Sequence, residues 1–185
     1  MTHLGTVPLE TERLILRPFR LDDAEAMYQN WASDPEVTKT LMWPTHESVE
    51  TSRAVLADWV GRYGEKDYYQ WAIVPKNGGD RPAGSIAVVR QDDTLRMVHI
   101  GYCLGRSWWG QGVMTEALAA LRRFFFCEVG VNRVESRHGT HNPASGRVMQ
   151  KCGMTREGTH RQADWDNQGV CDCTYYAILA EDYLG

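Results

Sequence analysis

The sequence lacks long apolar runs, an excess of basic residues and a secretory signal. No uncharged stretch in its 185 residues approaches the roughly 20 apolar residues that a helix needs to cross a bilayer. The 20 Lys and Arg against 24 Asp and Glu give a formal net charge of −4, and the amino terminus shows no basic-then-apolar pattern. We therefore expect a cytoplasmic protein with no membrane partner and no nucleic-acid partner.

The sequence also lacks a disulfide pattern and a metal-binding pattern. Its five cysteines are an odd number and include no Cys-x-x-Cys pair, which suits structural thiols in a reducing compartment. No His, Cys, Asp and Glu cluster has metal-ligand spacing, and no Ser-His-Asp order stands out, so we expect no metal. Repeats and linker-like stretches are missing as well, which predicts a single domain over residues 1–185.

One central segment combines three strong local patterns. The apolar run from Val98 to Leu104 predicts a buried strand, and Gly101 inside it indicates a bulge or a close backbone approach. Gly110 and Gly112 then mark a loop. Beyond the loop, apolar residues recur with helical spacing at Met114, Ala117, Leu118, Leu121, Phe124 and Phe125.

This order of strand, glycine loop and helix predicts an anion site. The first backbone amides of a helix have no acceptor inside the helix, and the helix dipole adds positive charge where they point. A side chain at Gly110 or Gly112 would hold an anion away from the backbone. We therefore expect a phosphate or pyrophosphate group to bind at this loop.

The remaining elements predict a mixed α+β fold. The central strand and the strand at 131–138 flank the central helix, which ends near Gly130, so they should run parallel to each other. Asn142 should cap a short helix that ends before Gly153. Other strands are expected at 13–19, 70–74, 83–89, 154–165 and 170–180, and other helices after Asp22 and from Thr45 or Ser48 to about Tyr63.

The loop Ser107-Trp108-Trp109-Gly110-Gln111-Gly112 resembles the acetyl-CoA loop of the GCN5-related N-acetyltransferases (GNAT). Their signature is Gln/Arg-x-x-Gly-x-Gly/Ala, from which Ser107 departs at the first position. The continuation Thr115-Glu116-Ala117-Leu118 is similar to the branch that acetylates the N-termini of ribosomal proteins. The segments 11–19 and 34–37 resemble the same branch, so the similarity covers nearly the whole chain.

The resemblance implies an α+β three-layer fold. Its mixed, mostly antiparallel sheet would have about seven strands flanked by helices, with a parallel pair splayed at the cofactor site. It also implies direct transfer of an acetyl group from acetyl-CoA to a primary amine in a ternary complex. A protein or peptide N-terminus is the leading acceptor. A polyamine or antibiotic amine, or a non-catalytic acetyl-CoA-binding domain, are the alternatives, and the protein would be a monomer or a homodimer.

The resemblance also assigns cofactor contacts. The central strand would pair its backbone with the pantetheine arm, which would explain Gly101. Asn142 and Ser145 resemble the Asn-x-x-Ser of the same branch, where Ser145 would protonate the departing thiolate; alternatively, they only cap and begin their helix. The implied contacts are Ile100, Gly101, Tyr102, Cys103, Leu104, Trp109, Gly110, Gln111, Gly112, Val113, Met114, Thr115, Asn142 and Ser145.

His99 is the leading candidate for the general base. It stands where relatives often have Glu, and the unperturbed pKa of histidine suits accepting a proton near neutral pH. It could equally be an ordinary histidine in a half-buried strand. Glu135 is a weaker candidate. His138, His141 and Asp172 are expected near the cleft, but they could be purely structural.

Two further alternatives concern the enzyme class and one loop. Gly110-x-Gly112 opening a helix, with Glu135 further on as a ribose-binding acid, could also indicate a nicotinamide-dependent oxidoreductase. Thr115 at the third glycine position and the single strand–helix–strand unit count against that class. The apolar loop from Leu41 to Pro44 is either core packing or a wall on the acceptor side.

Overall fold

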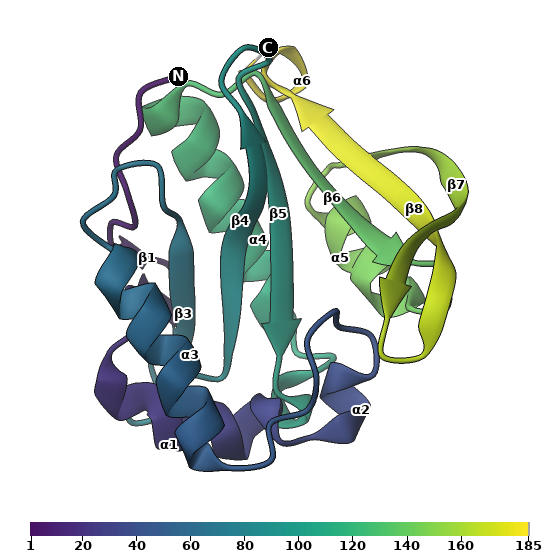
Figure 1. The fold of residues 1–185 in the computed structure, drawn as a ribbon. Coiled ribbons are helices and arrows are strands. Elements are labelled where there is room, and N and C mark those ends of the chain that lie inside the picture. Colours follow the sequence, from purple (N-terminus) through teal and green to yellow (C-terminus); the bar gives the residue numbers. More distant parts are fainter. Residues whose placement is uncertain (185) are drawn as a thin grey trace.

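A computed structural model describes residues 1–184 and contains one sheet of eight strands (Figure 1). The strand order is β1-β2-β3-β4-β5-β6-β8-β7. Every neighbouring pair is antiparallel except β5–β6, which is parallel as predicted. The strands are β1 (Leu9–Glu10), β2 (Leu14–Arg17), β3 (Gln70–Pro75), β4 (Gly84–Asp92), β5 (Met97–Leu104), β6 (Arg133–Gly139), β7 (Thr155–Asp166) and β8 (Gly169–Leu179).

The eighth strand, β1, was not predicted, because a two-residue strand is too short to show alternation. It pairs with β2 at the edge of the sheet. The helices are α1 (Ala24–Met27), α2 (Pro35–Thr38), α3 (Val49–Arg62), α4 (Val113–Phe124), α5 (Pro143–Lys151) and α6 (Ala180–Leu184). None of the helices in residues 1–184 combines the length and apolarity needed to span a membrane.

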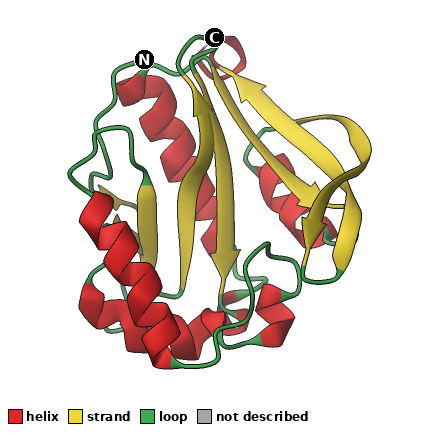
Figure 2. Ribbon diagram, viewed as in Figure 1, coloured by secondary structure: helices red, strands yellow, loops and turns green. Residues whose placement is uncertain are grey.

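The helices cover both faces of the sheet and form two cores (Figure 2). On one face, α4 and α5 pack against β2 to β6, and the predicted apolar face of α4 is buried there. On the other face, α1 and α3 pack against β3. Strand β5 serves both cores, because Val98 and Ile100 point into the first and Cys103 into the second.

The first helical region differs from the single helix expected after Asp22. It consists of a 3-10 turn at Leu21–Asp23, then α1, then a π-helical turn at Tyr28–Ala32. Ser33 closes the wide turn, since both its amide (3.1 Å) and its hydroxyl (2.7 Å) donate to the carbonyl of Tyr28. The wider turn accompanies a fully buried Trp31.

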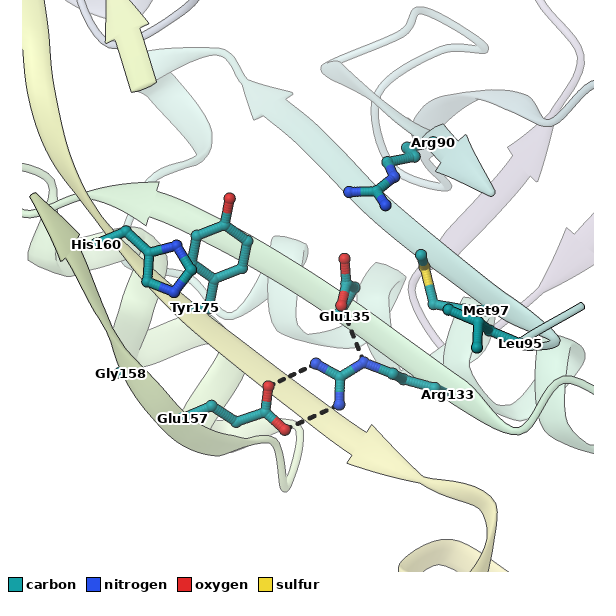
Figure 3. A pocket seen from close by; sticks show the side chains of 9 residues that line it. All are labelled: Arg90, Leu95, Met97, Arg133, Glu135, Glu157, Gly158, His160 and Tyr175. Carbon is teal, nitrogen blue, oxygen red and sulfur yellow. Dashed lines mark hydrogen bonds and ion pairs between the residues drawn. The ribbon is translucent and has the colours of Figure 1, made fainter. Parts of the chain in front are cut away.

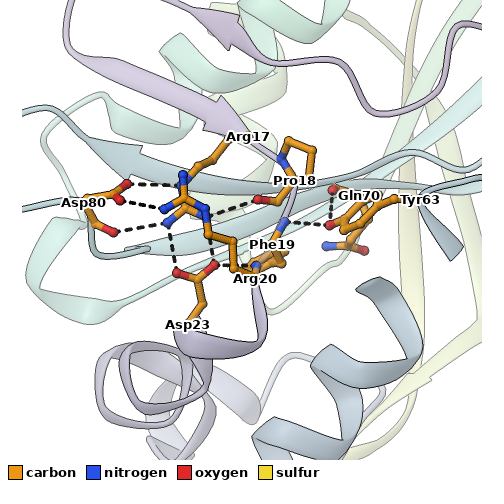
Figure 4. A network of polar contacts seen from close by, with 8 residues as sticks. All are labelled: Arg17, Pro18, Phe19, Arg20, Asp23, Tyr63, Gln70 and Asp80. Atoms are coloured by element: carbon orange, nitrogen blue, oxygen red, sulfur yellow. Dashed lines mark hydrogen bonds and ion pairs between the residues drawn. The ribbon is translucent and has the colours of Figure 1, made fainter. Parts of the chain in front are cut away.

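An ion-pair network whose inner pair, Arg17 and Asp23, is buried joins three parts of the amino-terminal half (Figure 4). We call it the Arg17 network (Arg17, Arg20, Asp23 and Asp80). Arg17 on β2 donates from Nη1 and Nη2 to the two carboxylate oxygens of Asp23, at 2.8 and 2.9 Å. Its Nε donates to Asp80, between β3 and β4, at 3.2 Å. The network therefore fixes the turn before α1 against the sheet.

Candidate active site

Strands β5 and β6 separate after three residue pairs. Pairing runs from Met97↔Arg133 to His99↔Glu135, after which the two strands diverge (Figure 1). We call the diverging segments, 100–104 of β5 and 136–139 of β6, the fork. The hydroxyl of Ser136 donates to the carbonyl of Ile100 at 2.7 Å, just where the strands part. The splayed parallel pair expected from the sequence is thus present.

Gly101 owes its identity to a neighbouring strand. The register between β4 and β5 shifts at Val88/Arg90, which leaves Val89 as the extra residue of a bulge. A Cβ on Gly101 would lie 2.8 Å from Cγ1 of Val89. The bulge lies on β4 and not on the strand of Gly101, and the atom that approaches this glycine belongs to a side chain and not to the backbone, so the pairing with a cofactor arm is not needed to explain this glycine.

The glycine loop (Trp109–Gly112) leads into the amino terminus of α4. Gly110 and Gly112 have φ of 73° and 77°, in the left-handed region that side chains disfavour. Among the described residues no side chain caps α4. The Trp109 amide donates to Arg106, and the next amide along the chain that donates is that of Glu116, to Gly112. The preceding amides at this helix end are therefore available to a ligand.

Arg13 and Glu116 brace this loop from outside. The carboxylate of Glu116 accepts from the Thr11 hydroxyl (2.6 Å), the Arg13 amide (2.9 Å) and Arg13 Nε (2.6 Å). Although partial burial opposes it, these hydrogen bonds hold the pKa of Glu116 below its usual value. Arg13 also donates to the Gln111 carbonyl at 2.9 Å, which places a guanidinium beside the glycine loop. Sequence analysis had missed Arg13.

Helix α5 begins at the far side of the fork. Asn142 is its N-cap, with its side chain accepting from the Ser145 amide, as predicted. The Ser145 hydroxyl lies 2.9 Å from the Tyr102 hydroxyl, which also donates to the Ser145 carbonyl at 3.1 Å. Burial raises the pKa of Tyr102. The structure thus brings Tyr102 and Ser145 together, a side-chain contact that the sequence did not predict.

His99 and Glu135 form a hydrogen-bonded pair at the base of the fork. His99 Nδ1 lies 2.9 Å from Glu135 Oε1, and both side chains are buried. Arg133 donates to the other oxygen of Glu135 at 2.9 Å and pairs with Glu157 (Figure 3). The hydrogen bond from His99 lowers the pKa of Glu135 to about 2. Burial opposes this shift, and Arg133 adds to it.

Glu135 is consequently an anion and a weak base. Its carboxylate holds a proton on Nδ1 of His99, so that Nε2 is the basic nitrogen of the imidazole.

A cavity of about 350 Å³ lies on this side of the sheet and reaches Glu135 (Figure 3). It is lined by Arg90, Leu95, Met97, Arg133, Glu135, Glu157, Gly158, His160 and Tyr175. We call the chain of His99, Glu135, Arg133 and Glu157 the Arg133 network.

Other residues expected nearby have structural contacts. A Cβ on Gly146 of α5 would lie 2.6 Å from Nε2 of His138, so this ring packs against the helix. The backbone of Asp172 accepts from the Thr140 amide, and its carboxylate accepts from that of Gln162.

One cluster of possible metal ligands was not indicated by the spacing of residues in the sequence. His141, Asp166 and Cys171 have ligand atoms within 4.8 Å of one another. His141 Nε2 already contacts the Asp166 carboxylate at 2.6 Å, and the other oxygen of Asp166 accepts from the Gln168 amide. Both carboxylate oxygens are therefore satisfied within the chain, and the absence of a metal stays a prediction.

The apolar loop from Leu41 to Pro44 has features of both alternatives. Leu41 and Trp43 pack against the core under α1 and α3. The loop is also tied to the β7–β8 turn, since Asn167 donates its amide to Leu41 (3.1 Å) and its side chain to Trp43 (2.8 Å). It therefore links the second core, under α1 and α3, to the β7–β8 hairpin.

Comparison with known proteins identifies the family. The acetyltransferase (GNAT) domain model matches residues 13–155, and the chain therefore belongs to the GNAT acetyltransferase family. It is 29% identical to an uncharacterized N-acetyltransferase, p20, of Bacillus licheniformis, covering 96% of this chain and 98% of the relative. It is 33% identical to the [ribosomal protein uS5]-alanine N-acetyltransferase of Escherichia coli, covering 85% of this chain and 82% of the relative.

A solved structure gives the same result for the fold. The crystal structure of a GNAT-family acetyltransferase from Bacillus anthracis superposes with a TM-score of 0.82 at 26% identity, covering 95% of this chain and 99% of that one. The chain is therefore an acetyl-CoA-dependent N-acetyltransferase with the α+β fold of its family. This finding decides against the nicotinamide-dependent alternative.

Proposed function

We propose that this enzyme acetylates the α-amine of a protein or peptide, with acetyl-CoA held between the fork and the glycine loop. The observation that carries the proposal is the fork itself: a parallel pair that opens beside a helix amino terminus whose first amides have no acceptor in the described chain. The amides would bind the pyrophosphate, and the free edge of β5 would bind the pantetheine arm.

The proposed cofactor contacts follow from this placement. Arg13, beside the loop, adds a cation that the sequence-based set lacked. The set otherwise comprises Ile100, Gly101, Tyr102, Cys103, Leu104, Trp109, Gly110, Gln111, Gly112, Val113, Met114, Thr115, Asn142 and Ser145.

The proposed proton transfers use both sides of the fork. His99 would take a proton from the acceptor amine, with Glu135 fixing the tautomer and stabilising the imidazolium that forms. Ser145 would give a proton to the sulfur as the C–S bond breaks. Glu135 is assigned a positioning role, because a carboxylate with a pKa of about 2 is a poor base near neutral pH.

Two observations support a protein or peptide acceptor. The similarity to the Escherichia coli enzyme named for ribosomal protein uS5 spans most of both chains. The cavity beside Glu135 lies on the face of the sheet opposite α4 and α5, where a chain end could enter. A small amine, or acetyl-CoA binding without turnover, remains an outcome of the test below.

The test is a screen of acetyl transfer across Ala- and Ser-initiated peptides, polyamines and aminoglycosides, with release of CoA as the readout. We expect turnover with peptides. Exclusive use of a small amine would overturn the acceptor assignment. Stabilisation by acetyl-CoA in a thermal titration, with no turnover on any amine, would show a binding domain instead.

A further inference from the structure

The hydroxyl of Tyr102 is a polar group at the fork that the proposed reaction does not yet use. It projects from β5 to the first turn of α5, where two oxygens of Ser145 lie within its reach: Oγ at 2.9 Å and the carbonyl at 3.1 Å. A phenol has one hydrogen and rotates about its C–O bond, so it can donate to either oxygen without moving the ring.

The surroundings of Tyr102 keep this hydrogen available. Burial raises the pKa of the phenol, so the group stays protonated at any pH at which the enzyme would work. Packing alone does not require the hydroxyl, because the ring contacts the apolar core that contains α4 and α5. Phenylalanine would fill the same volume. The hydroxyl is therefore distinguished by its contacts with Ser145 and not by its packing.

We propose that Tyr102 is a positioning residue that donates a hydrogen bond to Ser145 Oγ while Ser145 protonates the departing CoA sulfur. The inference rests on the acid role given to Ser145 in the proposed function. It adds a residue from β5 to a task otherwise assigned to α5 alone.

The step balances as follows. The amine nitrogen forms a bond to the acetyl carbon and loses its proton to His99. The C–S bond breaks, its electron pair goes to sulfur, and sulfur takes the proton of Ser145 Oγ. Tyr102 keeps its own proton, and its hydrogen bond stabilises the negative charge that develops on Oγ, since hydrogen bonds to charged oxygens are the stronger kind. Ser145 then regains a proton from water, and the hydroxide left behind takes the proton from His99, so both groups return to their starting state.

The chain offers a matched control on the same helix. Tyr176 of β8 is buried, and its hydroxyl accepts from Gln150 of α5 at 3.2 Å. Tyr176→Phe removes a tyrosine hydroxyl that contacts α5 away from Ser145. It therefore measures the effect on kcat of losing a hydroxyl contact that has no part in the proposed reaction.

The experiment is a double-mutant cycle on Tyr102→Phe and Ser145→Ala, with one Ala-initiated peptide as acceptor. We expect Tyr102→Phe to lower kcat by about 10- to 100-fold, the range for a hydrogen bond to a charged group. Its Kd for acetyl-CoA should stay within about twofold of wild type, and Tyr176→Phe should keep wild-type kcat. In the Ser145→Ala background, Tyr102→Phe should cost less than about twofold, because its partner is gone.

Each contrary result has a defined meaning. An equal loss of kcat in both backgrounds, or a change confined to acetyl-CoA affinity, would overturn the positioning role while leaving the proposed function intact. A wild-type enzyme without transfer to any amine would instead overturn the proposed function and the inference with it. If Tyr102→Phe lowers the melting temperature, 3-fluorotyrosine at position 102 provides a stronger donor of nearly the same shape; kcat should then rise, and a fall would overturn the proposal.

Discussion

The Arg17 network and the Arg133 network contain the same kinds of charged groups but differ in role. In both, an arginine on the sheet pairs with a buried carboxylate and with a second, exposed one. The Arg17 network lies where the chain turns from β2 to α1, and its inner carboxylate also accepts from the Arg20 amide at 2.8 Å. The Arg133 network instead ends on an imidazole, beside a cavity of about 350 Å³.

The difference between the two networks lies in what each buried carboxylate is paired with. Within residues 1–184, Asp23 accepts only from the Arg17 guanidinium and the Arg20 amide, neither of which releases a proton, so its network holds the fold together. Glu135 is instead paired with the imidazole of His99, the group proposed to take the proton of the acceptor amine. Gly112 and Gly130, left-handed glycines at opposite ends of the helical segment that begins with α4, allow a second comparison.

Breaking the inner pair of the Arg17 network should have the largest effect on stability. Asp23→Ala leaves a buried guanidinium without its bidentate partner, so the free energy of unfolding should fall by about 3–5 kcal/mol. Activity per folded molecule should stay at the wild-type level. Denaturant unfolding and active-site titration measure the two quantities, with the exposed neighbour Asp22→Ala as control. A folded Asp23→Ala enzyme that has lost turnover would erase the distinction between the networks.

Glu135→Gln tests the other network through pH. Because the folded pKa of Glu135, about 2, lies below its ordinary 4.5, its ionisation stabilises the fold above pH 4.5, and this contribution is lost as pH falls toward 2. Between pH 4.5 and about 2, the free energy of unfolding of the wild type should therefore fall by about 3 kcal/mol more than that of Glu135→Gln.

Turnover at neutral pH should also separate the networks. Glu135→Gln should lower kcat by about 10²-fold, because the amide cannot stabilise an imidazolium. Exposed Glu128→Gln is the control for both measurements. Unchanged kcat in Glu135→Gln would show that His99 does not act through this carboxylate.

The glycine comparison is sharpened by Gly112→Ala and Gly130→Ala. Both glycines have φ of 77° at opposite ends of the same helical segment, so each alanine should cost about 1–2 kcal/mol of stability. Only Gly112→Ala should also weaken acetyl-CoA binding, because its Cβ enters the glycine loop 3.4 Å from Arg13. Thermal shift with and without acetyl-CoA gives both values. Equal ligand-induced shifts in the two variants would contradict the assignment of the loop.

The smallest effect is expected at the exposed rim of the Arg17 network. Arg20 pairs with Asp80 at 2.8 Å, but both side chains are more than half exposed. Arg20→Ala should therefore change stability by less than about 1 kcal/mol and leave kcat unchanged. Salt should abolish even this difference, and a loss comparable to that of Asp23→Ala would mean that the network acts as one unit.

What the sequence predicted correctly was local. The strand, glycine loop and helix from Val98 to Phe125, the Asn142 cap and the stop at Gly130 each depend on residues within one or two turns of each other. The parallel pair followed from chain connectivity. Neither π-helical turn, at Tyr28–Ala32 or at Phe125–Val129, was predicted; the first is closed by the contact of Ser33 with the carbonyl of Tyr28, which periodicity does not indicate.

Contacts set by sheet register could not be predicted from sequence. Glu116 lies 103 positions from Arg13, and Ser145 lies 43 from Tyr102. His99 and Glu135 were both candidates, yet only the register of β5 against β6 makes them partners, and this pairing leaves Glu135 a weak base. Alternation does place Arg133 on the same face as Glu135, a signal that could have indicated the pair.

The short β5–β6 pairing has a mechanical consequence. Three residue pairs join these strands, against eight between β4 and β5 and seven between β6 and β8. The sheet is therefore a five-stranded body and a three-stranded body joined by a narrow seam. Separating β5 from β6 breaks fewer backbone hydrogen bonds than separating β4 from β5 or β6 from β8. Amide exchange at Val134 and Glu135 therefore measures the lowest-energy opening by which the two bodies separate.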